Sequence, residues 1–189
     1  MTSDTPSPGT WTRLERGRLL DDADERQEMG TGSLAVALEA EHHEIDAGIA
    51  AFAAAPGDPG PLARAVGALR RHIYLEEEFL FPLLREAEPA LMAPVLVMLR
   101  EHGQIWNSLD ALDEPAHSGT DTDIDIDAAR ETLRQLTVQL LHHNLKEEKI
   151  LYPRADVLLP PASAARLREF LDIGLLPDGW VCVKARPSG

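Results

Sequence analysis

One motif occurs twice in this chain and constrains its fold more than any other feature. It reads His-x-x-x-Glu-Glu-x-x-Leu-aromatic-Pro, and its copies run from His72 to Pro82 and from His143 to Pro153. On a helix of about 3.6 residues per turn, residues four apart lie above one another on the same face. Each copy therefore predicts a helix that presents an imidazole and a carboxylate together, which is half of a metal site.

A shorter repeat, Glu-His-x-x-Ile, precedes each copy of the motif, at residues 41–45 and 101–105. Its histidines, His42 and His102, fall within apolar stripes whose members lie three or four residues apart, a spacing typical of the buried face of a helix. The chain is therefore a doubled unit. In each half, a helix with one inward histidine is followed by a helix with the His-Glu pair.

This periodicity predicts an all-α fold, namely an antiparallel up-down-up-down four-helix bundle with a short fifth helix and a C-terminal tail. Residues 1–32 lack a sustained apolar period, so we expect a loosely ordered N-terminal arm. The bundle is expected over residues 33–156, with Ser33 as the N-cap of its first helix. Residues 157–189 are expected to form the short helix, from about Ala162 to Ile173, and an apolar tail packed on the bundle.

The fourth helix is expected to follow an acidic linker over residues 113–127. Asp is a poor strand former, and the glycine and glutamate of an EF-hand are missing at the required offsets, so neither a strand nor a calcium loop is predicted. The inward residues expected on this helix are Leu133, Leu136, Leu140, His143, Glu147 and Ile150.

The charge of the chain limits the classes of partner. A net charge of −14 disfavours nucleic acid and anionic membrane surfaces, and leaves small molecules and metal cations as the expected partners. We find neither a signal peptide nor an apolar run of membrane-spanning length, so we expect a cytoplasmic protein. Cys182 is the only cysteine, and between two valines it is expected to be a small buried hydrophobe. A metal would therefore be held mainly by nitrogen and oxygen.

Six ionisable side chains fall on the inward faces of the four predicted helices. Burying such groups costs free energy unless they are paired or bind a metal. A single inward histidine, or a single His-x-x-x-Glu pair, is ordinarily a structural feature, but their joint occurrence on all four helices favours metal binding. The predicted ligands are His42, His72, Glu76, His102, His143 and Glu147.

The number and type of these ligands indicate a dinuclear centre. Six are too many for one tetrahedral zinc, and the imidazole content is too high for magnesium or calcium. If each metal takes two imidazoles and both carboxylates bridge, an oxo or hydroxo bridge brings each metal to five ligands. An octahedral ion then keeps one position for dioxygen, peroxide or nitric oxide. Mixed nitrogen and oxygen ligation favours two iron ions, with manganese or zinc as substitutes.

The residues from about Ser33 to Asp156 resemble the hemerythrin-like family, also called HHE cation-binding domains, through the two long motifs. The resemblance implies a non-haem di-iron four-helix bundle that binds oxygen or related oxidants. It also implies that the four histidines named above are terminal ligands and that Glu76 and Glu147 are bridges.

The chain departs from the oxygen-carrying members of that family at two positions. Those members have a second histidine four residues after the third-helix ligand, where this chain has Trp106, and an aspartate where this chain has Glu147. The ligand set is more similar to that of the iron-centre repair proteins and the iron-sensing hemerythrin domains, which disfavours simple oxygen carriage. Residues 1–32 do not match the cysteine-containing N-terminal domain that repair proteins usually carry.

The leading hypothesis is a di-iron protein that binds or reduces a small oxidant, namely dioxygen, hydrogen peroxide or nitric oxide, under oxidative or nitrosative stress. Such a centre would support consumption of peroxide or nitric oxide without catalytic residues outside the metal site. The alternatives are a sensor of iron, oxygen or redox state, or an iron-centre repair protein, that signals through bundle stability rather than turnover. A metal-free structural bundle is a third hypothesis.

Two further groups of residues surround the predicted site. Tyr74, Trp106 and Tyr152 are expected to pack in the seam and at helix ends rather than to act at the metal. Four carboxylates either orient the ligand imidazoles through hydrogen bonds or lie on a solvated helix face. These carboxylates belong to Glu41, Glu77, Glu101 and Glu148.

Overall fold

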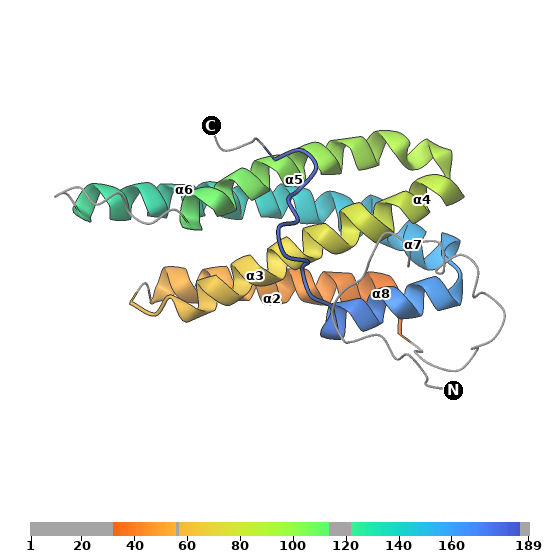
Figure 1. The fold of residues 1–189 in the computed structure, drawn as a ribbon, viewed down its shortest axis with the longest axis horizontal. Helices are drawn as coiled ribbons and strands as arrows, with labels where there is room; N and C mark the ends of the chain where they lie inside the picture. Colours follow the sequence, from red (N-terminus) through yellow and green to blue (C-terminus); the bar gives the residue numbers. More distant parts are fainter. Residues whose placement is uncertain (1–31, 56, 114–121, 186–189) are drawn as a thin grey trace.

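A computed structural model describes residues 32–55, 57–113 and 122–185. Every regular element in these ranges is helical (Figure 1), as the periodicity predicts. The elements are α2 (Leu34–Ala54), α3 (Gly60–Leu75), η1 (Glu76–Leu80), α4 (Phe81–Ala87), η2 (Pro89–Leu91), α5 (Met92–Asp113), α6 (Thr122–Lys146), η3 (Glu147–Leu151), α7 (Tyr152–Leu158) and α8 (Pro161–Ile173). The predicted N-terminal arm lies almost wholly outside the described residues. Among the described helices, none is long and apolar enough to cross a membrane.

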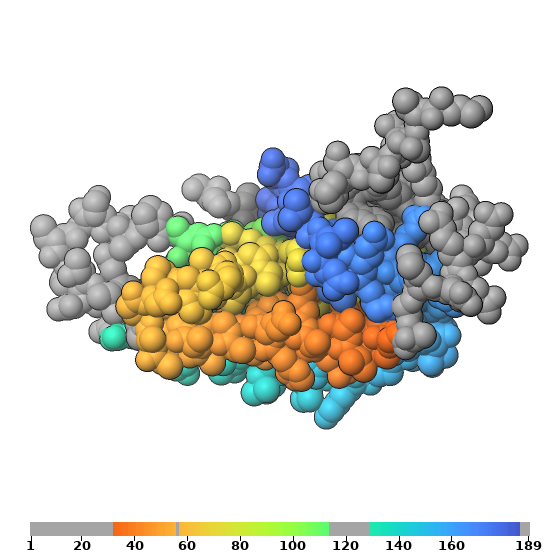
Figure 2. All heavy atoms as spheres, turned by 90° about the horizontal axis from the view of Figure 1, so that it is seen from below, coloured from red at the N-terminus to blue at the C-terminus, as the bar shows by residue number. Residues whose placement is uncertain are grey.

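The long helices pack as a bundle. Helix α2 packs mainly against α3, and α5 mainly against α6, so each half of the doubled sequence forms one helix pair. Figure 1 shows both pairs lying lengthwise, with α8 against one end of α2. Figure 2 shows α2 along one face of the molecule, with α3 and α8 beside it. The predicted helical bundle is confirmed at this level.

Helix α2 begins at the predicted cap. The Ser33 hydroxyl oxygen accepts a hydrogen bond from the Val36 backbone N–H at 3.1 Å. The same hydroxyl donates to Asp156, whose carboxylate also accepts from the Leu34 backbone N–H at 2.7 Å. An aspartate from the end of α7 thus completes the cap, and a negative charge at this end of a helix is favourable.

Each copy of the long motif contains a π-helical turn, η1 in the first copy and η3 in the second. The Phe81 N–H donates to the carbonyl of Glu76, and the Tyr152 N–H donates to the carbonyl of Glu147, in each case across five residues. The proline that follows lacks an N–H and would clash with the carbonyl four residues before it, so a wider turn accommodates it.

The π turn changes which residues of the second motif face inward. Ile150 is 45% exposed, whereas Leu151 is buried. The prediction that Ile150 faces inward was therefore wrong, because it assumed an uninterrupted α-helical register. The predicted ligands His143 and Glu147 come before the change of helical register, so their inward orientation is unaffected.

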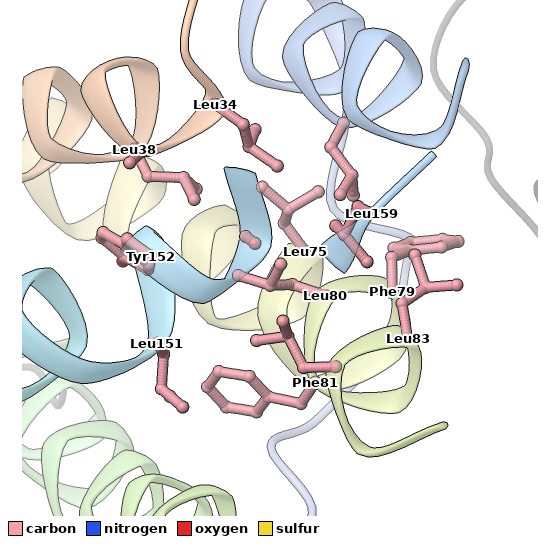
Figure 3. Packing of buried hydrophobic residues seen from close by; sticks show 14 of the residues in the cluster. Leu34, Leu38, Leu75, Phe79, Leu80, Phe81, Leu83, Leu151, Tyr152 and Leu159 are labelled. Atoms are coloured by element: carbon pink, nitrogen blue, oxygen red, sulfur yellow. The ribbon is translucent and has the colours of Figure 1, made fainter. Parts of the chain in front are cut away.

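Two apolar clusters enclose the middle of the bundle. One, part of which Figure 3 shows, gathers residues near α8, including Leu38, Leu80 and Phe81. The other gathers residues nearer the opposite end, including Ile45 and Leu136. The predicted ligand on α2, His42, lies between Leu38 of the first cluster and Ile45 of the second. The polar residues of the bundle are therefore enclosed by apolar walls.

The structure also corrects the length of the linker before the fourth helix. Helix α6 begins at Thr122, so residues 122–127 are helical rather than part of the linker. Helix α8 and the buried tail residue Cys182 agree with the prediction of a short helix and a packed tail.

Candidate metal centre

All six predicted ligands lie together between the two apolar clusters. Each is at most 3% exposed. Helices α2 and α5 supply one histidine each, and the two copies of the long motif supply the His-Glu pairs. The residues are His42 on α2, His72 and Glu76 on α3 and η1, His102 on α5, and His143 and Glu147 on α6 and η3.

These residues form two overlapping groups, in each of which one ligand atom per residue lies within 4.8 Å of all the others. One group contains Glu76, His102, His143 and Glu147, and the other contains His42, His72 and Glu147. We call these groups the His102–His143 half and the His42–His72 half. Because Glu147 belongs to both, the two halves share a carboxylate.

In the His102–His143 half, the Nε2 atoms of the two histidines are 3.1 Å apart. The His102 Nε2 atom lies 3.2 Å from Oε2 of Glu76, and the His143 Nε2 atom lies 3.1 Å from Oε1 of Glu147. Two imidazole nitrogens and two carboxylate oxygens thus converge on one point.

The His42–His72 half repeats this arrangement. Its two histidine Nε2 atoms are also 3.1 Å apart. The His42 Nε2 atom lies 3.5 Å from Oε2 of Glu147, and the His72 Nε2 atom lies 3.5 Å from Oε2 of Glu76. Both carboxylates therefore reach both pairs of histidines.

The outer nitrogen of each histidine contacts a carboxylate. The Nδ1 atoms of the two long-motif histidines contact the glutamates of the short repeats. The Nδ1 atoms of the two short-repeat histidines contact the glutamates that follow Glu76 and Glu147. The pairs are His72 with Glu41 at 2.7 Å, His143 with Glu101 at 3.1 Å, His102 with Glu77 at 3.0 Å, and His42 with Glu148 at 3.0 Å. This confirms that the four carboxylates orient the imidazoles.

The donor set fits a cation. A neutral histidine that donates its Nδ1 hydrogen to a carboxylate has only a lone pair at Nε2. When the histidines are neutral, two such lone pairs face one another at 3.1 Å in each half, and neither nitrogen can donate to the other. Oε2 of Glu76 and Oε1 of Glu147 are buried and have no hydrogen-bond partner. Buried acceptors that lack donors need a positive charge among them.

The electrostatics agree with this reading. Burial and the charge of Glu147 oppose ionisation of Glu76, but His72 and His102 outweigh them and lower the pKa of Glu76 to about 2. Burial also opposes protonation of His72, but Glu76 and Glu41 raise the pKa of His72 to about 10. Without a metal, protons on histidine balance the carboxylates, and a cation can replace them.

The hydroxyl of Tyr152 also lies in the centre, on the His42–His72 side. It is 2.9 Å from Nε2 of His42, 3.1 Å from Nε2 of His72, 2.9 Å from Oε1 of Glu76 and 3.2 Å from Oε2 of Glu147. The prediction that this tyrosine only packs was wrong. The sequence signal for it was the aromatic position of the motif, which is Phe81 in the first copy and tyrosine in the second.

The other aromatic residues pack as predicted. Tyr74 contacts Phe79, Phe170 and Trp180, and Trp106 contacts Trp180. The histidines adjacent to ligands, His43 and His142, are exposed.

The C-terminal tail contacts one of the orienting carboxylates, which sequence reasoning missed. The Val183 backbone N–H donates to Oε2 of Glu77 at 2.9 Å, and the Cys182 thiol donates to Oε1 at 3.1 Å. Burial raises the pKa of Cys182 to about 12, so the group is a thiol rather than a metal-binding thiolate. The tail thus contacts the carboxylate that orients His102.

Comparison with known proteins agrees with the site. Residues 33–155 match the family model of the hemerythrin HHE cation-binding domain. No curated protein and no solved structure matches the chain. The matched range contains all six converging residues, and their buried cluster is able to bind metal ions. The chain therefore belongs to the hemerythrin HHE cation-binding domain family.

Proposed function

We propose that this chain is a non-haem di-iron protein that binds or reduces a small oxidant, namely dioxygen, hydrogen peroxide or nitric oxide. The observation that carries the proposal is the pair of half-sites joined by two shared carboxylates. Each half offers two imidazole nitrogens, and Glu76 and Glu147 face both halves. Mixed nitrogen and oxygen ligation of this kind suits iron better than zinc, magnesium or calcium. An oxo or hydroxo bridge completes the proposed centre.

The proposal includes an antiparallel up-down-up-down order of the four long helical segments. In that order each pair of facing helices presents one histidine from the short repeat and one from the long motif. A cytoplasmic location, where iron and reductants are available, belongs to the same proposal.

The residues around the centre would hold the ligands and keep bulk water out. The four orienting carboxylates fix each imidazole with its Nε2 atom inward, so little reorganisation is needed when metal binds. The apolar clusters on both sides favour small ligands over large or charged ones. When bound, two ferrous ions supply two electrons to the oxidant.

Turnover tests this proposal. Diferrous protein with an excess chemical reductant is expected to consume many equivalents of peroxide or nitric oxide, followed with an electrode. The His143→Ala variant is expected to lose that consumption, and His142→Ala, which changes an exposed neighbour, is expected to retain it. Consumption that is equal in all three proteins would contradict a reaction at this centre.

A specific contact favours a sensor as the second candidate. The tail donates two hydrogen bonds to Glu77, which in turn orients His102, so a change at the metal can reach the tail. In a sensor, iron loss or oxidant binding would release the tail. Limited proteolysis near Trp180, with and without iron, distinguishes the candidates. Stoichiometric binding with a change in cleavage supports the sensor, and sustained consumption with unchanged cleavage supports the enzyme.

A further inference from the structure

The Tyr152 hydroxyl faces two carboxylate oxygens with a single hydrogen to donate. The side chain is fully buried, and four ligand atoms surround its oxygen at 2.9 to 3.2 Å. A phenol has one hydrogen to donate. It can therefore donate to only one of the two carboxylate oxygens that face it, Glu76 Oε1 and Glu147 Oε2.

The spacing of these atoms is that of ligands around a single ion. An octahedral ion with bonds of about 2.1 Å holds neighbouring ligand atoms about 3.0 Å apart. The tyrosine oxygen stands close to that separation from all four of its neighbours. Among those neighbours, His42 Nε2 lies 3.1 Å from His72 Nε2 and 3.5 Å from Glu147 Oε2, so all of them can surround one ion.

We propose that Tyr152 is a fifth protein ligand to the metal of the His42–His72 half, bound through its phenolate oxygen. The inference rests on the proposed di-iron function. Binding replaces the O–H bond with a metal–oxygen bond, and the proton leaves to solvent. The negative phenolate also helps to balance the charge of the ion in a buried site.

The proposal makes the two metal positions unequal. In the first copy of the motif the equivalent residue is Phe81, whose ring stacks on His102 with its centroid 5.5 Å away, and it has no oxygen to offer. The His102–His143 half therefore keeps the exchangeable position. This half also lies beside a surface pocket of about 200 Å³ whose lining includes Glu101, the carboxylate that contacts His143.

The chain offers a simple test because it contains only two tyrosines. Iron-loaded, air-oxidised protein is expected to show a visible phenolate-to-ferric charge-transfer band, with tyrosine ring vibrations enhanced in resonance Raman spectra excited within it. The Tyr152→Phe variant is expected to lose both signals. The matched Tyr74→Phe variant changes a tyrosine packed among Phe79, Phe170 and Trp180, and is expected to keep them.

The outcomes separate this inference from the proposed function. Wild-type protein with about two irons and an oxo-bridge absorption, but without tyrosine ring vibrations, would overturn the ligand and leave the di-iron function standing. Loss of the band in Tyr74→Phe would also overturn it. Wild-type protein that binds no iron would overturn both. If Tyr152→Phe fails to hold iron, persistence of the band in Tyr74→Phe still identifies the ligand.

Discussion

The two halves of the metal centre share their ligand plan but differ in one atom. Each half has two histidines whose Nε2 atoms are 3.1 Å apart, and each outer nitrogen is held by a glutamate. The aromatic residue of the motif is Tyr152 on one side and Phe81 on the other. A repeated sequence therefore produces a symmetric scaffold, and a single hydroxyl makes its two positions chemically distinct.

The largest expected effect comes from removing what the halves share. Glu147 faces both pairs of histidines, so Glu147→Ala is expected to lower iron content from about two per chain to near zero. Elemental analysis measures the loss, and circular dichroism checks that the helices persist. Glu44→Ala, which removes an exposed carboxylate from α2, is the control. A variant that still binds one iron tightly would show that the halves are independent sites.

A substitution confined to one half is expected to remove about one iron per chain rather than two. His143→Ala should leave one iron, bound in the His42–His72 half, and should abolish the oxo-bridge absorption. His142→Ala changes the exposed neighbour and should keep both irons. Retention of the bridge absorption in His143→Ala would contradict the assignment of this histidine.

The orienting carboxylates are expected to contribute to metal affinity, and the more buried carboxylate is expected to contribute more. The Glu41 side chain is 7% exposed and that of Glu101 is 24% exposed. Glu41→Gln should weaken metal binding by about 10- to 100-fold, and Glu101→Gln should weaken it less, because solvent screens the more exposed charge. Competition with a coloured chelator measures both affinities. A larger loss of affinity in Glu101→Gln than in Glu41→Gln would contradict the expected order of the two carboxylates.

The six converging residues were accessible from the sequence because they lie in repeated motifs. The two long motifs and two short repeats place all six converging residues, and the spacing of Glu41, Glu77, Glu101 and Glu148 relative to them made hydrogen bonds to the imidazoles one of two open readings. Ser33 was recognisable as a cap because it precedes an apolar period directly. Local pattern and helical geometry are sufficient for features of this kind.

Other features depended on departures from regular geometry. The exposure of Ile150 follows from a π-helical turn, whose register the 3.6-residue period does not contain. The place of Tyr152 in the centre follows from the same turn, since it brings inward a residue nine positions after His143. The contacts of Cys182 with Glu77 join segments more than a hundred residues apart, and no local pattern indicates them.

Proton release should accompany metal binding. Since Glu76 and Glu41 raise the pKa of His72 to about 10, this histidine is protonated in the metal-free fold at neutral pH. Its stabilising charge is fully present below the unfolded value and is lost as pH rises through about 10. A metal must displace the proton, so apparent affinity should rise about tenfold per pH unit for each proton displaced, between about pH 6 and pH 8. Affinity that is independent of pH would contradict this coupling.

The smallest expected effect concerns the number of exogenous ligands. If Tyr152 occupies one position, azide should titrate diferric wild-type protein with about one equivalent per chain, and the Tyr152→Phe variant with up to about two. Absorbance titration against measured iron content gives the ratio. Two equivalents in the wild-type protein would show that the halves are equally open.

The central claim is that two joined half-sites hold two irons. The most direct test is iron content by elemental analysis, followed by Mössbauer spectroscopy of protein loaded with ⁵⁷Fe and exposed to air. We predict about two irons per chain, with two quadrupole doublets of equal area, because the halves differ at Tyr152 and Phe81. A single iron per chain, or a zinc that iron does not displace, would contradict the account.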